Sequence, residues 1–249
     1  MADKYLISLD LPSYMTDCHK RLRPVYFMCL AQELALKGAD VLGFGYDITL
    51  SRGVSWVLSR MHVKYLDTPR WRDEISMRTW HKGLNGLYFI RDFEMLDSGE
   101  RPVALATSSW VLMNVTERRV TRPDRLSDIV PSQPQCEESA IEENAPKLQI
   151  PKDAEAVRLR SHRVHFSDID FIGHTNNTKY IEWALDCVPE ELLLNRQVKD
   201  FYVNYIQESK LDDVIDLYLC TPPPAEDGRH NIIEGRLGDR PIFICDFVF

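Results

Sequence analysis

The sequence has few cysteines, and their spacing excludes the usual cysteine frameworks. Six cysteines are scattered over 249 residues without a C-x-x-C pair. Neither a zinc site nor a disulfide scaffold is therefore indicated. Because free cysteine is among the residue types most often buried, we expect these thiols to lie mainly in the core.

Long apolar segments are also missing. No stretch approaches the roughly 18 residues that a membrane-spanning helix needs. The first residues, MADKYLISLDLP, lack a basic segment followed by an apolar core. We therefore expect a soluble, cytoplasmic protein that does not act at a membrane.

An excess of basic residues is absent as well. Lys and Arg number 30 against 38 Asp and Glu, which gives a net charge of -8. Half of that charge, net -4, falls in residues 132–156, so the remainder is only mildly acidic. Nucleic acids attract basic surfaces through their phosphates, and this balance predicts no nucleic-acid partner.

The acidic segment also separates two parts of the chain. Prolines recur at Pro123, Pro131, Pro134, Pro146 and Pro151, and no sustained apolar periodicity runs through this region. Such composition is typical of a linker that crosses the surface. We predict domains at 1–125 and 157–249, joined by an acidic, proline-containing linker at 126–156.

Each part reads as one amphipathic helix followed by strands, an α+β pattern in which an antiparallel sheet wraps around a central helix. The first helix is predicted over 24–37, where Pro24 suits the first turn and Gly38 is interpreted as the stop. Predicted strands cover 6–11, 55–66, 74–81, 87–96 and 103–115 in the first part, and 201–208, 214–221, 231–237 and 242–249 in the second.

The two parts align with each other. Placing residues 60–80 over 200–220 without gaps matches Val63 with Val203, Tyr65 with Tyr205, Asp73 with Asp213 and Ile75 with Ile215, at an offset of 140. Placing Asp17 over Asp170 gives an offset of 153, so the first part has the longer helix-to-strand connection. Under these offsets the first part has Arg21 and Thr68 where the second has His174 and Glu208.

Polar chemistry is concentrated in residues 167–186, SDIDFIGHTNNTKYIEWALD. Gly173 permits a turn, Asn176 or Asn177 suits a helix N-cap, and the following apolar residues recur at helical spacing until Pro189. A helix N-terminus offers free N–H groups and partial positive charge, which suit an oxyanion or a polarised carbonyl. We expect the active site here.

The pattern D-x-x-G-H-x-N-N-x-x-Y, formed by Asp170, Gly173, His174, Asn176, Asn177 and Tyr180, resembles the signature of hot-dog-fold thioesterases. Four blocks in the first part, SWVLSRMHVKY, PRWRDEISMRTW, FIRDFEML and ATSSWVLMNVTERRV, resemble blocks of the acyl-ACP thioesterases of plants and bacteria in the same order. This resemblance covers most of the chain outside the linker.

The resemblance implies a tandem, or double, hot-dog fold. Residues 1–125 would form an N-terminal hot-dog that binds the acyl chain without a complete catalytic set, with Met28 or Trp56 as possible lining residues. Residues 157–249 would form the catalytic hot-dog. The implied reaction hydrolyses the thioester of acyl-acyl carrier protein and releases a free fatty acid, which ends fatty acid synthesis. Alternatives are an acyl-CoA thioesterase, a hot-dog hydratase and a non-catalytic acyl-binding module.

The resemblance also implies roles for site residues. Asp170 would order the catalytic network or act as base or nucleophile, and His174 would polarise the carbonyl or activate water. Glu208, expected at the end of a strand, would be the general base or nucleophile. Two positions depart from the family: Ile172 replaces an asparagine, whose role Asn176 or a backbone amide would take, and Ser209 replaces a cysteine.

No cofactor or metal is expected. His162 and His165 are predicted to lie on opposite faces of a strand, which does not suit a shared metal ion. Acyl carrier protein is acidic, so docking requires a local basic patch, for which the candidates are Lys20, Arg21 and Arg23, or Arg118, Arg119, Arg122 and Arg125. A fused pair is compatible with a monomer or a homo-oligomer.

Overall fold

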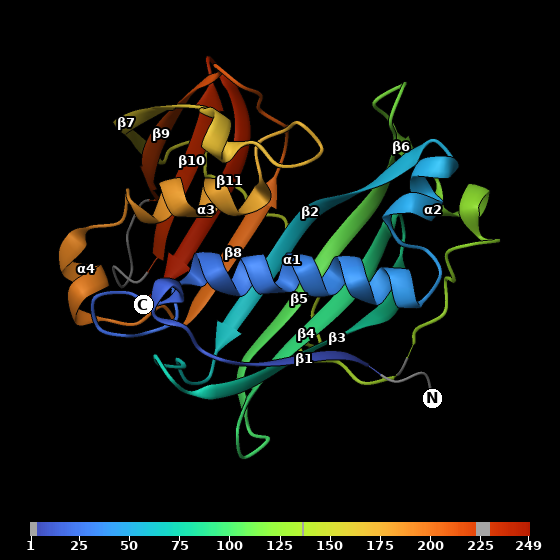
Figure 1. Cartoon of the computed structure of the whole chain (residues 1–249). Helices are drawn as coiled ribbons and strands as arrows, with labels where there is room; N and C mark the ends of the chain where they lie inside the picture. Colours follow the sequence, from blue (N-terminus) through green and yellow to red (C-terminus); the bar gives the residue numbers. More distant parts are fainter. Residues whose placement is uncertain (1–3, 136, 223–229) are drawn as a thin grey trace. The chain divides into compact units, whose positions relative to one another are not determined.

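The computed structural model describes residues 4–135, 137–222 and 230–249. The chain divides into two compact units, Met1–Ala145 and Pro146–Phe249, which we call unit 1 and unit 2. The boundary between them lies within the predicted linker. Each unit contains its own set of antiparallel strands and its own helix packed on them (Figure 1).

Unit 1 contains an antiparallel sheet with strand order β1-β3-β4-β5-β2, and β6 pairs with β5. Its elements are β1 (Tyr5–Asp10), η1 (Ser13–Met15), α1 (Pro24–Val41), α2 (Tyr46–Ser51), β2 (Val54–Tyr65), β3 (Glu74–Asn85), β4 (Tyr88–Asp97), β5 (Pro102–Asn114), β6 (Val120–Thr121) and η2 (Pro123–Leu126). Helix α1 packs on β1 and β3. Its buried face, with Phe27, Met28 and Leu34 at most 2% exposed, supplies the core of this unit.

Unit 2 repeats this plan with strand order β8-β11-β10-β9-β7, again antiparallel. Its elements are β7 (Glu155–Arg163), η3 (Phe166–Asp168), α3 (Asn177–Leu185), α4 (Glu190–Asn195), β8 (Asp200–Tyr205), β9 (Val214–Thr221), β10 (His230–Leu237) and β11 (Arg240–Val248). Helix α3 packs on β10 and β11. Tyr180, Ile181 and Ala184 face the core on this helix, at the spacing that the sequence predicted.

Corresponding elements of the two units keep the offsets found in the sequence. The 3-10 turns η1 and η3, the isolated bridges Thr16–Leu22 and Ile169–Thr175, and the first residues of α1 and α3 all differ by 153. Further along, Asp73 accepts the Arg70 N–H at 2.7 Å and Asp213 accepts the Lys210 N–H at 2.8 Å, a difference of 140. The predicted alignment therefore pairs residues with the same local structure.

The prediction that Gly38 ends the first helix was wrong. Helix α1 continues through Gly38 to Val41. A Cβ atom built at Gly38 would lie 2.9 Å from Arg91 Nη1. Position 38 thus lacks a side chain because the buried Arg91 guanidinium approaches the helix closely, and the glycine has no role as a stop.

The prediction that Glu208 lies at the end of a strand was also wrong, because β8 stops at Tyr205. Glu208 lies in the loop that follows, and the N–H groups of Ile206 and Gln207 both donate to the Ile242 carbonyl oxygen as the chain turns away. Similarly, β7 ends at Arg163 and Phe166 begins the 3-10 turn η3, so His165 lies beyond the strand on which it was predicted.

Part of the predicted linker is fixed to unit 1. Residues 131–135 and 137–142, which we call the strap, lie against β3 and β4. Trp80 Nε1 donates to the Glu138 carbonyl oxygen at 2.8 Å, and the Ala140 N–H donates to Asp92 Oδ2 at 2.8 Å. Just before the strap, Leu126 and Val130 join a buried cluster with Phe44 and Phe89.

Candidate functional site

The loop before α3 is shaped by Asp170. Its Oδ1 atom accepts the Ile172 N–H at 2.9 Å and the His174 N–H at 3.4 Å. The Gly173 N–H donates to the Asp170 carbonyl oxygen at 3.0 Å, with Gly173 at φ +87°, a region that favours glycine. The Asp170 carboxylate therefore sets the backbone position of His174.

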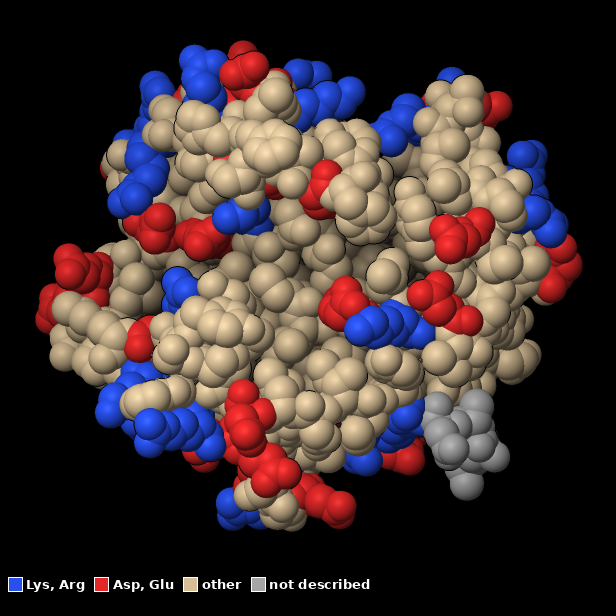
Figure 2. Space-filling view, in the orientation of Figure 1, with Lys and Arg blue, Asp and Glu red and all other residues tan. Residues whose placement is uncertain are grey.

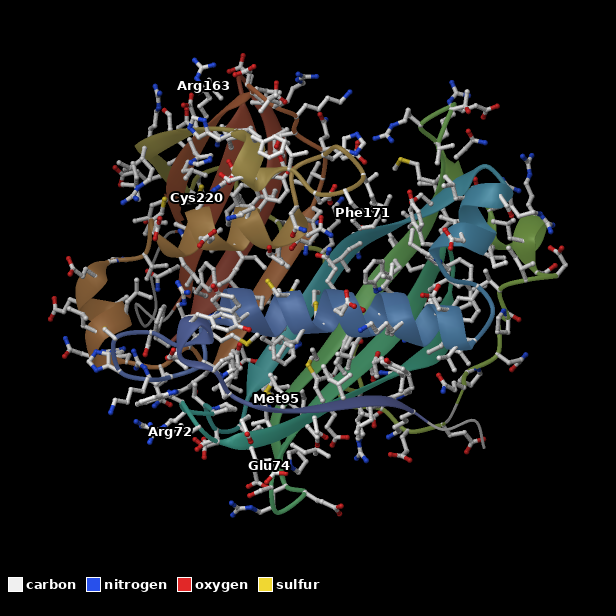
Figure 3. All side chains as sticks on the ribbon, in the orientation of Figure 1. Arg72, Glu74, Met95, Arg163, Phe171 and Cys220 are labelled. Atoms are coloured by element: carbon white, nitrogen blue, oxygen red, sulfur yellow. The ribbon has the colours of Figure 1, made fainter. Side chains whose placement is uncertain are left out.

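Ile172 contributes to this loop through its backbone. Its N–H is one of the two groups that hold the Asp170 carboxylate, while its side chain is exposed. The neighbouring Phe171, labelled in Figure 3, is 69% exposed. The isoleucine at this position therefore leaves the loop hydrogen bonds intact.

Asn176 is the N-cap of α3. Its side-chain oxygen accepts the Thr178 N–H at 3.0 Å and the Thr178 hydroxyl at 2.8 Å. This cap satisfies one of the free N–H groups of the helix and leaves the N–H of Asn177, the first helical residue, to meet other acceptors. The predicted N-cap is confirmed.

His174 and Glu208 come together from two separate loops. His174 Nε2 lies 3.3 Å from Glu208 Oε2, and the two side chains are 22% and 30% exposed. A partly exposed imidazole beside a carboxylate can exchange protons with a bound molecule. Of the four predicted site residues, these two form the direct side-chain contact, and Asp170 joins them through the His174 backbone.

Unit 1 has the same loop with different side chains. Asp17 Oδ1 accepts the N–H groups of His19 and Arg21 at 2.8 and 2.9 Å, just as Asp170 accepts those of Ile172 and His174. At the position of His174, however, Arg21 pairs with Asp17 at 2.8 Å. Thr68 occupies the position of Glu208, so the histidine–carboxylate pair has no counterpart in this loop of unit 1.

The sequence analysis did not predict a second polar cluster, which lies next to the loop before α3. The buried Asp168 accepts a hydrogen bond from His162 Nε2 at 2.9 Å and from the His165 N–H at 2.9 Å. Burial alone would raise the pKa of this carboxyl, but the two hydrogen bonds, together with the charges of His162 and Lys179, outweigh burial and lower the pKa of Asp168. The Asp168 backbone carbonyl oxygen accepts the Asn176 N–H at 2.8 Å, so the main chain of this residue is tied to the helix N-cap.

The prediction for His162 and His165 was wrong in geometry. Their rings lie 5.8 Å apart because the strand ends before His165, and the His162 ring stacks on Trp183 at 4.1 Å. Within the described ranges, no group of three or more His, Cys, Asp or Glu side chains is placed to hold a metal ion. In the same part of the chain, no helix is long and apolar enough to cross a membrane.

The predicted basic cluster of Lys20, Arg21 and Arg23 is not one patch. Arg21 is drawn into its pair with Asp17, and Arg23 lies over the Tyr26 ring. Lys20 instead lies 5.4 Å from the Trp71 ring, with Arg72 on the same ring at 4.2 Å. Figure 2 shows basic side chains exposed at the position where Figure 3 labels Arg72.

Comparisons with known proteins define first a class and then a family. Over 98% of its length the chain superposes on an acyl-ACP thioesterase from Bacteroides thetaiotaomicron (21% identity, TM-score 0.85, 96% of that chain) and on the 12:0-ACP thioesterase from Umbellularia californica (23%, 0.86, 96%). This likeness shows the fold, and the predicted tandem hot-dog is confirmed.

The family models are more specific. The acyl-ACP thioesterase N-terminal domain matches residues 2–128, and the C-terminal domain matches residues 151–240. The chain therefore belongs to the acyl-ACP thioesterase family, as its motifs predicted.

Curated relatives agree with this assignment. Oleoyl-acyl carrier protein thioesterase 2 of Arabidopsis thaliana is 30% identical over 79% of this chain, and a palmitoyl-acyl carrier protein thioesterase of the same plant is 30% identical over 74%. The alignments span 57% and 47% of those two proteins, so the chain covers about half of their length.

Proposed function

We propose that the chain hydrolyses the thioester of acyl-acyl carrier protein and releases a free fatty acid. The observation that supports this most directly is the contact of His174 with Glu208 at 3.3 Å beside the N-terminus of α3. Family membership supports acyl-ACP as the substrate class, because the plant and bacterial relatives are named as acyl-ACP thioesterases.

In the proposed reaction, Glu208 acts as general base toward a water molecule bound beside His174. The water oxygen forms a bond to the thioester carbon as its proton passes to the Glu208 carboxylate. Collapse of the tetrahedral intermediate breaks the carbon–sulfur bond, and a proton carried by His174 passes to the departing thiolate. Glu208 attacking directly to form an anhydride is the alternative covalent route.

The oxyanion of this intermediate requires hydrogen-bond donors. The Asn177 N–H, at the first position of α3, has the location and the partial positive charge that suit this role. The Asn176 side chain uses its oxygen for the helix cap, so its amide nitrogen is the part that can face a substrate. Asp170 holds His174 in place from the opposite side of the loop.

The carrier is proposed to be acyl carrier protein, docking through basic side chains of unit 1. Lys20 and Arg72 flank Trp71 and make no ion pair with the described part of the chain, whereas Arg21 is neutralised by Asp17. The relatives are named for oleoyl, palmitoyl and 12:0 chains, so the family does not fix one chain length. Cytoplasmic location, oligomeric state and the channel lining by Met28 or Trp56 stay predictions.

Release of free thiol from a panel of acyl-ACPs and acyl-CoAs tests the proposal. Wild type is compared with Asp170→Ala, His174→Ala and Glu208→Ala, and with Thr68→Ala, which changes the unit 1 counterpart of Glu208, as a matched control. Rapid cleavage of acyl-ACP that falls at least about a hundredfold in the three unit 2 variants, and not in the control, is expected.

Three other results would each contradict the proposal. Preference for acyl-CoA would indicate a CoA thioesterase. Loss of water from a 3-hydroxyacyl thioester, without thiol release, would indicate a hydratase. Tight binding of an acyl thioester without turnover would indicate an acyl-binding module.

A further inference from the structure

Directly behind the His174–Glu208 pair lies a buried network of three hydroxyl groups. Thr175 Oγ1 lies 2.8 Å from Ser209 Oγ and donates to the Ser209 carbonyl oxygen at 3.0 Å. The Tyr180 hydroxyl lies 2.9 Å from Ser209 Oγ and accepts the Ser209 N–H at 3.1 Å. The three residues are at most 5% exposed.

Unit 1 shows the same place built from apolar residues. Leu22, Phe27 and Pro69 occupy the positions of Thr175, Tyr180 and Ser209, and all three are buried. The Leu22 N–H donates to the Pro69 carbonyl oxygen at 2.8 Å, as the Thr175 N–H donates to that of Ser209 at 3.0 Å.

The aromatic packing corresponds as well. The Phe27 and Tyr65 ring centroids lie 6.0 Å apart, and those of Tyr180 and Tyr205 lie 5.9 Å apart. In unit 2 the Ser209 N–H donates to the Tyr180 hydroxyl. In unit 1 Pro69 has no N–H group and Phe27 has no hydroxyl, so the donor and the acceptor of that bond are both absent.

The comparison of the two units separates the side chains that folding requires from those that function requires. Apolar packing is sufficient to form this corner of the fold in unit 1. Burying hydroxyl groups costs free energy that their hydrogen bonds only roughly offset, so the network in unit 2 brings little net stability over apolar side chains. Hydrogen bonds are directional, however, and a fully satisfied network fixes atoms more narrowly than apolar contacts do.

The network is connected through the backbone to both members of the His174–Glu208 pair. Thr175 directly follows His174, and Ser209 directly follows Glu208. We propose that Thr175, Tyr180 and Ser209 are positioning residues that hold the Glu208 carboxylate within reach of His174. This inference rests on the proposed function for its catalytic consequence, but its structural content does not depend on it.

Tyr180 anchors the network to α3. It is 3% exposed, and its ring also packs against Phe243 at 5.0 Å. Burial raises the pKa of Tyr180, so the phenol keeps its proton and remains able to donate at neutral pH. Ser209 thus supplies a hydroxyl that can donate to one neighbour while accepting from the other.

Activity measurements test the inference with substitutions that keep the volume nearly unchanged. Tyr180→Phe, Ser209→Ala and Thr175→Val should each lower kcat about tenfold, while KM changes less than twofold and Tm changes little. Thr175→Ser keeps the hydroxyl and should keep the wild-type kcat. Tyr218→Phe is the matched control, because it removes a tyrosine hydroxyl from β9 of unit 2, where the Tyr218 ring lies under Arg236 and outside the network. Unchanged kcat in the three variants, or an equal loss in Tyr218→Phe, would overturn the inference.

A crystal structure of Tyr180→Phe provides the readout that does not need turnover. The distance between His174 Nε2 and Glu208 Oε2, 3.3 Å here, should lengthen or the Glu208 side chain should adopt several conformers. An unchanged pair would refute the positioning role. Absence of thiol release by the wild type would instead refute the proposed function and leave this structural test intact.

Discussion

At the residue scale, Asp170 is a turn-forming side chain as well as a predicted site residue. Its Oδ1 atom binds two N–H groups, and Asp17 does the same in unit 1, where no histidine follows at the equivalent position. The carboxylate is therefore part of the loop architecture that the two units share. Its contribution to the site is superimposed on that structural task.

A pair of substitutions separates the two tasks in terms of stability. Asp170→Asn keeps an oxygen that can accept both N–H groups, so its Tm should match that of the wild type. Asp170→Ala leaves these groups without their acceptor and should lower the free energy of unfolding by about 1 kcal/mol. Thermal and urea unfolding measure both effects.

Asp17→Ala serves as the comparison in unit 1. It should cost more than Asp170→Ala, because the partly buried Arg21 guanidinium also loses its carboxylate. Equal stability of Asp170→Ala and wild type would show that the loop does not depend on this carboxylate.

The sequence predicted the local structure of residues that lie close together in the chain. Asp170, Gly173, His174 and Asn176 lie within one turn and helix cap, whose requirements are local. The contacts of Ser209 with Tyr180 and Thr175 span 29 and 34 residues, and no local pattern encodes them. The available signal was the internal alignment, which pairs these three polar residues with Leu22, Phe27 and Pro69.

At the scale of elements, the strap and β3 are joined through His81. His81 Nε2 donates to the Pro131 carbonyl oxygen at 3.0 Å, and the Gln135 N–H donates to the His81 carbonyl oxygen at 2.8 Å. Burial, with the nearby charge of Arg91, lowers the pKa of His81 from 6.5 to about 4. The folded protein therefore holds this imidazole neutral.

Stability should consequently fall in mildly acidic solution. Between pH 6.5 and 4 the unfolded chain binds a proton at His81 that the folded chain does not, so stability conferred by His81 is complete above pH 6.5 and is lost as the pH falls toward 4. From pH 7 to pH 5 this loss is about 2 kcal/mol. Urea unfolding should show a smaller loss in His81→Gln than in wild type, and equal losses would contradict the assignment.

The basic side chains around Trp71 come from two loops: Arg72 from the loop between β2 and β3, and Lys20 from the loop before α1. Lys20 and Arg72, at φ +63° and +75°, extend this surface from two loops that meet at the hydrogen bond from the Trp71 N–H to the Lys20 carbonyl oxygen. Arg72→Glu should raise KM for acyl-ACP several-fold and leave hydrolysis of a small, uncharged acyl thioester unchanged. The difference should shrink at high salt.

Lys37→Glu is the matched control, since it makes the same charge change on the exposed side of α1. An equal rise of KM in Lys37→Glu would show that net charge, and not this surface, governs the carrier. No change in Arg72→Glu would place docking elsewhere.

At the scale of the whole molecule, the structure buries several cysteine thiols, as the sequence analysis expected. Cys187, Cys220 and Cys245 are buried, and Cys18 is exposed, while Cys136 lies outside the described residues. Burial raises the pKa of Cys187 and of Cys220 to about 11 and raises the pKa of Cys245 well above its ordinary value. Their thiolate forms are therefore scarce near neutral pH.

Alkylation should distinguish these cysteines. At pH 8 iodoacetamide should modify Cys18 within minutes, and Cys187, Cys220 and Cys245 only at the rate at which the protein unfolds. Peptide mass mapping identifies each site, and Cys18→Ser removes the fast labelling of the peptide that contains residue 18 as a control. Fast labelling of Cys245 in the folded protein would contradict its burial.

The repeated architecture was predictable because each unit forms from local signals: helix periodicity, alternating strands and turn residues. The errors arose where tertiary contacts override those signals. Gly38 lacks a side chain because Arg91 approaches it, and the chain leaves β8 early because Ile206 and Gln207 bond to Ile242. The residues next to Gly38 and Ile206 in the sequence do not indicate either contact.

The correspondence between the units also makes unit 1 a scaffold for design. Its loop already has the Asp17 turn and the same backbone bonds, so seven positions separate it from the proposed site in unit 2. Arg21→His and Thr68→Glu would introduce the pair, and Arg23→Asn and Pro24→Asn would introduce the helix cap and the N–H of the first helical residue. Leu22→Thr, Phe27→Tyr and Pro69→Ser would add the supporting hydroxyls. A chain that carries the proposed site in both units is thus seven substitutions away from this one.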